Sequence, residues 1–107
     1  MMPKNGATAF GLSDDTWLQI RQTLAQYPQI EQAILYGSRA KGNYKPGSDI
    51  DLTLKGAQLN MGLLGSIEQS LDDLLLPYQI DLSLYAQLNH AELTEHIDRV
   101  GQVIYQG

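Results

Sequence analysis

Two short segments in which polar and apolar residues alternate constrain the fold of this chain more than any other feature. In residues 49–54 every second residue is apolar, and residues 79–85 repeat the pattern. Such alternation is typical of a β-strand with one buried and one polar face, because successive side chains point to opposite sides of a strand. The polar face of the first predicted strand carries Asp49 and Asp51, and that of the second carries Asp81.

The rest of the chain predicts helices and strands that alternate along the sequence. Helices are indicated by apolar residues at helical spacing, and buried strands by short apolar runs bounded by turn residues. The predicted elements are, in order, a helix from Ser13 to before Pro28, a strand at 33–36, a short helix at 38–41, a loop at 43–48, the strand at 49–54, a helix at 64–75, the strand at 79–85, a helix that Asn89 caps and Gly101 ends, and a strand at 103–105. We therefore expect an α/β fold in which helices cover a small mixed β-sheet, in the order α-β-α-β-α-β-α-β.

Length and composition predict one domain. The chain has 107 residues, of which 43% are hydrophobic and 18% charged, as in an ordinary globular domain. We expect a flexible tail at 1–11, which lacks the basic-then-apolar plan of a signal peptide, and a single domain at 12–107. Because the chain has no cysteine, disulfides, thiolate zinc sites and cysteine nucleophiles are excluded. No apolar run approaches the roughly 20 residues that span a bilayer, so we expect a cytoplasmic protein without membrane contact.

The charge of the chain argues against a long nucleic acid as its main substrate. The net charge is −5, whereas proteins that bind such polymers normally present a basic face. Four of the seven basic residues nevertheless fall between positions 39 and 55, namely Arg39, Lys41, Lys45 and Lys55. A local cationic patch favours a compact anion such as a triphosphate. A solvated loop with scattered basic residues explains the same charges equally well.

The three aspartates predict a metal site if the two strands are neighbours. Residues two apart on a strand share a face about 6.5–7 Å apart, so Asp49 and Asp51 project together, and Asp81 would join them. Crowded carboxylates repel unless cations neutralise them, and ligation by oxygen alone favours Mg²⁺ or Mn²⁺ over zinc. Two such ions are the usual device for in-line attack at phosphorus. Alternatively, Asp49 caps a loop and the other two are solvated strand residues, but aspartate is disfavoured in strands.

A glycine and a serine follow the first apolar run and predict a phosphate-binding turn. Gly37 lets the backbone come close to a ligand, and the helix that follows offers unpaired N–H groups, to which the Ser38 hydroxyl adds a donor. Arg39 and Lys41 are placed to assist, although either would equally suit a solvated surface. An ordinary strand-to-helix turn with a serine cap is the alternative for the pair alone. We favour the phosphate site because the predicted metal-binding face begins a short loop later.

Two strings of residues carry a resemblance to a known family. They are residues 35–42, LYGSRAKG, and residues 47–52, GSDIDL. Together with the later strand aspartate, Asp81, they resemble the signature of the DNA polymerase β-like nucleotidyltransferase superfamily. With so short a chain, the resemblance is closest to the minimal nucleotidyltransferase (MNT) family, and it extends over nearly all residues from Ser13 onward. It implies the polymerase β-like fold and a Mg²⁺-dependent enzyme that moves a nucleoside monophosphate from an NTP, with ATP the expected donor, onto a hydroxyl.

The resemblance also implies a role for each site residue. Asp49 and Asp51 would hold both of two metal ions, and Asp81 would complete one site and help deprotonate the attacking hydroxyl. Gly37 and Ser38 would hold the β- and γ-phosphates. Members of the minimal family act as antitoxins beside a small helical HEPN toxin. The resemblance therefore implies a hetero-oligomer in which this chain adds AMP to a tyrosine hydroxyl of such a toxin.

Two other classes of function remain open from the sequence. One is a non-catalytic antitoxin that binds nucleotide and neutralises its partner by complex formation. The other is a different D-x-D enzyme, such as a phosphatase or glycosyltransferase, which would not need Gly37 and Ser38 before the aspartates. No short motif selects the base, and Tyr44 in the loop is only a weak candidate for stacking on it. His90 and His96 are expected on the last helix, away from the motif, with no role.

Overall fold

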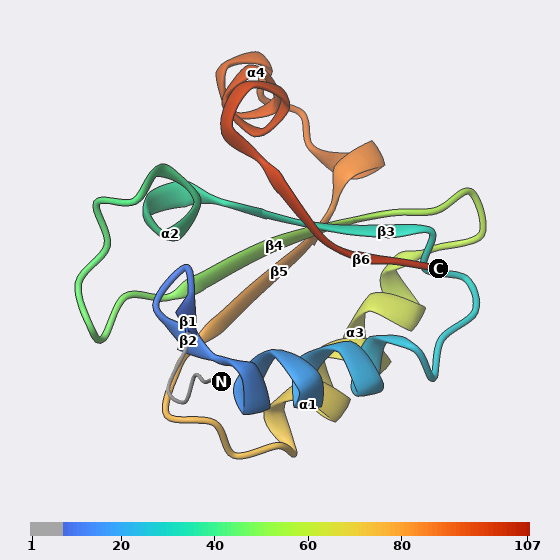
Figure 1. Ribbon diagram of the computed structural model, residues 1–107. Coiled ribbons are helices and arrows are strands. Elements are labelled where there is room, and N and C mark those ends of the chain that lie inside the picture. Colours follow the sequence, from blue (N-terminus) through green and yellow to red (C-terminus); the bar gives the residue numbers. More distant parts are fainter. Residues whose placement is uncertain (1–7) are drawn as a thin grey trace.

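A four-stranded sheet in the order β5-β4-β3-β6 forms the centre of the computed structural model, which describes residues 8–107 (Figure 1). The elements in chain order are β1 (Thr8–Ala9), β2 (Leu12–Ser13), α1 (Asp14–Leu24), β3 (Gln32–Tyr36), α2 (Gly37–Lys41), β4 (Ile50–Lys55), α3 (Met61–Asp72), β5 (Ile80–Leu84), the 3₁₀ turn Tyr85–Gln87, α4 (Ala91–Val100) and β6 (Gln102–Gln106). From α1 onward, this succession confirms the predicted order of helices and strands.

The sheet is mixed, as the sequence predicts. β3 lies antiparallel to both β4 and β6, whereas β4 and β5 are parallel and are connected through α3. Helices α1 and α3 lie together on one face of the sheet, and α4 lies on the other, above β3 (Figure 1). The face that α1 and α3 leave free is therefore only partly covered, and it is the face on which the polar residues of β4 and β5 lie.

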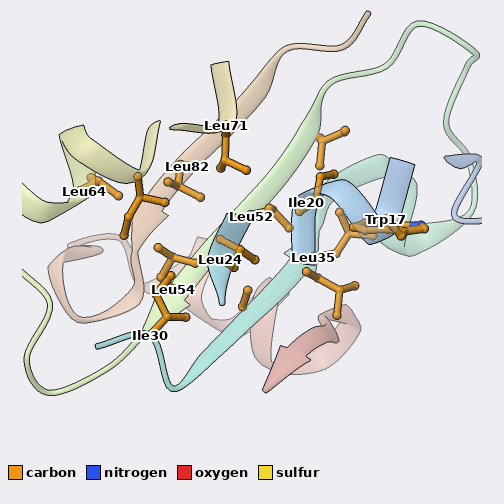
Figure 2. Close-up of a cluster of buried hydrophobic side chains, with 14 of the residues drawn as sticks. Trp17, Ile20, Leu24, Ile30, Leu35, Leu52, Leu54, Leu64, Leu71 and Leu82 are labelled. Atoms are coloured by element: carbon orange, nitrogen blue, oxygen red, sulfur yellow. The ribbon is translucent and has the colours of Figure 1, made fainter. Parts of the chain in front are cut away.

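The hydrophobic core fills the space between the sheet and the α1–α3 layer (Figure 2). The buried side chains labelled there are Trp17, Ile20, Leu24, Ile30, Leu35, Leu52, Leu54, Leu64, Leu71 and Leu82. Each large apolar side chain buried in this way contributes about 1.5–3 kcal/mol. Because Leu52 and Leu82 point into the core, the residues before them on β4 and β5 must point to the opposite face. The alternation seen in the sequence thus sets which face carries carboxylates.

Capping side chains set where the helices begin. The Ser13 hydroxyl accepts the Thr16 N–H at 3.1 Å, which confirms the predicted start of α1. At α4 the predicted cap is wrong by one position: Nδ1 of His90, not Asn89, accepts a backbone N–H, that of Leu93. None of the helices in residues 8–107 has the length and hydropathy needed to cross a bilayer.

Helix α3 ends earlier than its apolar pattern predicts. The sequence places Leu74 and Leu75 in this helix, whereas the helix stops at Asp72. Leu75 has φ +55° and a side chain that is 87% exposed, so it contributes little to the core. The helix ends before Pro77 because proline has no N–H to donate and disfavours helical geometry in the residue before it.

A small hairpin precedes α1, and its first strand and turn fall in the segment that the sequence assigns to the tail at 1–11. Residues 1–7 lie outside the described residues, but Thr8–Ala9 pairs with Leu12–Ser13. The indole N–H of Trp17 donates to the Ala9 carbonyl at 2.8 Å, and the Phe10 ring meets Trp17 edge-on. The folded unit among the described residues therefore begins before residue 12, because a buried tryptophan binds the hairpin.

Candidate active site

Asp51 and Asp81 lie beside each other on the partly covered face of the sheet, opposite to α1 and α3. The parallel register of β4 and β5 pairs Asp51 with Asp81, and the antiparallel register of β3 and β4 pairs Tyr36 with Asp51. The expectation that the two aspartate-bearing strands are neighbours is confirmed. Asp49 precedes β4 by one residue instead of belonging to it, and it is exposed at the end of the loop. Three acidic residues thus approach one end of the sheet from two strands and a loop.

The electrostatics of this face show an excess of negative charge. Burial raises the pKa of Asp51 above its usual range, and the negative charges of Asp81 and Asp49 raise it further. Burial also raises the pKa of the Tyr36 phenol; a hydrogen bond with Ser83 opposes this, and the charges of Asp51 and Asp81 add to it. Tyr36 is therefore a neutral phenol at pH 7, next to carboxylates that repel one another.

The donor set suits a hard divalent cation. All three acidic groups offer oxygen, the ligand atom that Mg²⁺ and Mn²⁺ prefer, and a cation there would relieve the repulsion that raises the pKa of Asp51. Within residues 8–107, however, no three acidic, histidine or cysteine side chains are gathered closely enough to hold an ion as they stand. Coordination by all three aspartates requires their side chains to draw closer together.

Position 37 requires a glycine because of its contact with Asp51. It follows β3 directly, has φ +77°, and is placed so that a Cβ atom would collide with Oδ2 of Asp51. A side chain at position 37 would be strained by its backbone and would displace the carboxylate. The turn and the aspartate face, which the sequence treats as two motifs, are therefore one packed unit. Ser38 follows, half-buried, at the start of the short helix α2.

His96 contacts this turn, so the prediction that it lies away from the motif is wrong. The Gly37 N–H donates to Nε2 of His96 at 3.2 Å, and the imidazole meets the Tyr36 ring edge-on with centroids 6.3 Å apart. His96 and Gly37 are 59 positions apart in the sequence. No local pattern around His96 reveals the contact, because it depends on how α4 folds back over β3. The sequence motifs also give no role to Tyr36. Its position at the end of a strand, directly before Gly37, is a local signal that it lies beside the turn.

Arg39 points inward, and this corrects its predicted role as a phosphate ligand. Its side chain is only 1% exposed. Nε and Nη2 donate to the Ser48 carbonyl at 3.1 and 2.7 Å, Nη2 also donates to Pro46 O at 3.4 Å, and Nη1 donates to Phe10 O at 2.9 Å. The buried guanidinium is thus hydrogen-bonded to backbone carbonyls and presents no free cation to a triphosphate. It instead fixes the loop that leads to Asp49.

Two tyrosines complete the surroundings of Arg39. The guanidinium carbon lies 5.2 Å from the ring centroid of Tyr44 and 5.1 Å from that of Tyr78, distances suited to cation–π attraction. Tyr44 also packs so closely on Gly11 that a Cβ there would overlap its ring. Its face is therefore engaged inside the protein, which weakens its candidacy for stacking on a base.

The predicted cationic patch is smaller than the sequence indicates. Arg39 is buried, and Nζ of Lys55 lies 4.4 Å from the ring centroid of Tyr85, at the other end of β4 from Asp51. Lys41, at the end of α2, and Lys45, in the loop, are exposed. Of the four clustered basic residues, these two remain available to an anion.

Comparisons with known proteins agree with this fold. Residues 18–107 match the sequence profile of the family described as "Polymerase beta, Nucleotidyltransferase". Among solved structures, a toxin–antitoxin complex with AMP-PNP contains a chain of 22% identity and TM-score 0.69, with 85% of this chain and 73% of that chain covered. An MNT antitoxin in complex with a tri-AMPylated HEPN toxin from Shewanella oneidensis gives 19% identity and TM-score 0.64, with 86% and 71% covered.

A MntA–HepT toxin–antitoxin structure gives 18% identity and TM-score 0.65, with 89% of this chain and 74% of that chain covered. At these identities the likeness is one of fold. Comparison with curated proteins finds no match.

Proposed function

The chain belongs to the polymerase beta nucleotidyltransferase family, and from this premise we propose that it transfers AMP from ATP to a tyrosine hydroxyl of a HEPN toxin and thereby acts as the antitoxin. The observation that carries the proposal is the packing of the Gly37 turn on Asp51, with Asp81 in register beside it. A candidate phosphate-binding turn thus lies against the Asp51 carboxylate, with Asp81 on the neighbouring strand, and this supports transfer at phosphorus, which depends on positioning and charge neutralisation.

Two Mg²⁺ ions, or Mn²⁺ in their place, are the proposed cofactors, with Asp49, Asp51 and Asp81 as their ligands. The chemistry of the donor set and the raised pKa of Asp51 support this assignment. Bound there, the ions would neutralise charge on the phosphates and make the acceptor hydroxyl easier to ionise. Half-buried Asp51 feels the charges of both exposed carboxylates, Asp49 and Asp81, and is therefore the ligand proposed to contact both ions.

The protein groups themselves would align the reactants. Ser38 and the turn around it would hold the β- and γ-phosphates through a hydroxyl and backbone N–H groups. Asp81 is exposed at the edge strand β5, so an incoming tyrosine approaches it from solvent, and its carboxylate would accept the hydroxyl proton. The acceptor oxygen forms a bond to the α-phosphorus, the bond from that phosphorus to the β-phosphate oxygen breaks, and pyrophosphate leaves.

Three observations support the choice of donor, acceptor and partner. One structure of the same fold contains AMP-PNP, and another contains a tri-AMPylated HEPN toxin bound to an MNT antitoxin. The net charge of −5 agrees with a nucleotide and a protein as partners in preference to a long nucleic acid. We therefore propose a cytoplasmic hetero-oligomer of this chain with a HEPN toxin. Lys41 and Lys45 are the exposed cations proposed to attract the triphosphate.

The deciding experiment incubates the protein with each of the four α-labelled NTPs, Mg²⁺ and the HEPN toxin proposed as its partner. Intact masses of both proteins identify the nucleotide and the acceptor together, and release of pyrophosphate separates this reaction from phosphatase chemistry. Asp72 on α3 provides a matched control, because it is an exposed aspartate on the layer across the sheet. The enzymatic proposal fails if Asp51→Asn neutralises the toxin as fully as Asp72→Asn does, because neutralisation would then rest on binding alone.

A further inference from the structure

Helix α4 supplies a side chain to the turn that begins α2. Nε2 of His96 accepts the Gly37 N–H at 3.2 Å, and the half-buried imidazole contacts Tyr36 edge-on. Among the residues of α4, His96 therefore joins the C-terminal part of the chain to the strand end where the candidate site lies. Nothing in the proposed chemistry requires a histidine, so the contact calls for a separate explanation.

The Gly37 N–H is a donor that the local chain leaves without a partner of its own. The first N–H groups of a helix have no carbonyl within the helix to bond, and at α2 the N-cap residue Tyr36 provides no side-chain bond. Gly37 also has φ +77°, a conformation that glycine holds only weakly because it has others at similar energy. An acceptor fixed on another element therefore selects one orientation of this peptide group.

That orientation matters because of the neighbour of Gly37. A Cβ atom on Gly37 would collide with Oδ2 of Asp51, so a rotation of the turn changes the space available to this carboxylate. We propose that His96 is a positioning residue of the nucleotide site: by accepting the Gly37 N–H, it holds the turn against Asp51 and leaves the Ser38 hydroxyl and the following N–H groups for the triphosphate. This inference rests on the proposed function, and its test is read partly from the nucleotide-free protein.

The chemistry of the contact defines which substitutions preserve it. An imidazole nitrogen that accepts a hydrogen bond carries no proton, so the contact requires Nε2 of His96 to be the acceptor nitrogen of the ring. The side-chain oxygen of glutamine occupies nearly the position of Nε2 and also accepts. Leucine fills a similar volume and cannot accept. The pair His96→Gln and His96→Leu therefore separates the acceptor from the packing.

His90 provides a matched control on the same helix. Its Nδ1 also accepts a backbone N–H, that of Leu93 at 3.1 Å, but it lies at the N-cap of α4. His90→Leu removes an imidazole acceptor from α4 and reports how far general weakening of this helix affects the site. Melting temperatures of the four proteins show whether each variant is folded before its kinetics are compared.

The experiment measures transfer kinetics from MgATP and the ¹H–¹⁵N signal of Gly37 without nucleotide. Loss of one hydrogen bond corresponds to about a 2- to 12-fold effect, so His96→Leu is expected to raise KM for MgATP by this factor and to change kcat less. His96→Gln is expected to restore KM to within about twofold of the wild type. The Gly37 amide signal should move in His96→Leu and stay nearly in place in His90→Leu and His96→Gln.

Two results overturn the inference. One is an unchanged Gly37 signal in His96→Leu, and the other is equal KM values for His96→Gln and His96→Leu. A failure of the proposed function is distinguishable from both, because it appears as absent transfer by the wild type. In that case the inference is tested by the Gly37 signal and by the affinity for MgATP measured by calorimetry. His96→Leu is expected to shift the signal and weaken the affinity, and His96→Gln is expected to restore both.

Discussion

Gly37 and Asp51 lie so close together that a methyl group on the one would occupy the space of the other's carboxylate oxygen. This contact joins the end of β3 to the polar face of β4. The residue before Ser38 must be glycine for two independent reasons. One is its positive φ, and the other is the space that Asp51 needs. A substitution at position 37 should therefore disturb the carboxylate as well as the turn.

Gly37→Ala is expected to abolish most of the activity, by on the order of 100-fold, because misplacing a reacting group by about 1 Å has that effect. Gly42→Ala is the control: Gly42 has φ +89°, and no atom lies within 4 Å of the place that a Cβ would take. It should lose about 1–2 kcal/mol of unfolding free energy through backbone strain and keep its activity. Denaturant unfolding and AMP transfer are measured on both. Equal activities for the two variants would show that strain alone, and not Asp51, determines the need for glycine.

Asp51→Asn and Asp81→Asn are each expected to reduce transfer by on the order of 10²–10⁴-fold, since each removes a proposed metal ligand and Asp81 also a proton acceptor. Asp72→Asn, on the other side of the sheet, should change it less than twofold. Chelation of divalent ions with EDTA should stop transfer by the wild type, and added Mg²⁺ should restore it. Initial rates with labelled ATP measure all four effects. Activity that persists in EDTA would contradict the metal assignment.

The pH dependence of stability should report the charge around Asp51. Because the folded pKa of Asp51 is raised by burial and by Asp81 and Asp49, the protonated form is favoured in the folded state. The stability this contributes is complete below the unfolded pKa of about 3.9 and is lost as the pH rises through the folded pKa.

Urea unfolding in EDTA is measured from below the unfolded pKa of Asp51 to above its folded pKa. Asp51→Asn should not show the wild type's loss of stability as the pH rises. Its unfolding free energy at pH 7 should exceed that of the wild type by about 0.5–2 kcal/mol. Saturating Mg²⁺ should reduce the advantage of the variant. A variant that is less stable than the wild type at pH 7 in EDTA would contradict the account of repelling carboxylates.

Arg39→Lys is expected to destabilise the protein by about 2–4 kcal/mol, because an ammonium cannot reproduce the guanidinium bonds to three backbone carbonyls. Arg21→Lys is the matched control: its Nε donates to Ile104 O at 2.6 Å and its guanidinium lies over Trp17, but the side chain is exposed. That variant should lose less than about 1 kcal/mol. Chemical denaturation measures both. If Arg39→Lys instead kept full stability and raised KM for ATP, Arg39 would be a phosphate ligand after all.

The parts of the structure that the sequence predicts well are those fixed by local pattern. Alternation along 49–54 and 79–85 predicts which face carries Asp51 and Asp81, and Ser13 marks the start of α1 because its hydroxyl bonds three residues ahead. These features need only the neighbouring residues and the requirement to bury apolar side chains.

The errors at the candidate site concern contacts that depend on how the chain folds back on itself. From the sequence, Arg39 is interpreted as a surface cation, because no sequence pattern indicates that the carbonyls of Phe10 and Ser48 accept its hydrogen bonds. His96 reads as a surface residue because its partner, Gly37, lies on another element. In both cases the side chain bonds backbone atoms, which every residue has, so the identity of the partner leaves no trace in the sequence.

The in-register pairing of Asp51 with Asp81 has a consequence for folding. Along a strand, a slip of one residue exchanges the two faces, so shifted pairing of β4 and β5 would turn Asp81 into the apolar layer beneath α3 and expose Leu82 in its place. Burying an unpaired carboxylate is strongly unfavourable, so the misaligned sheet is excluded by the same leucines that build the interior. A molecule of this protein that has completed its core has therefore also brought its two strand aspartates side by side, before any nucleotide arrives.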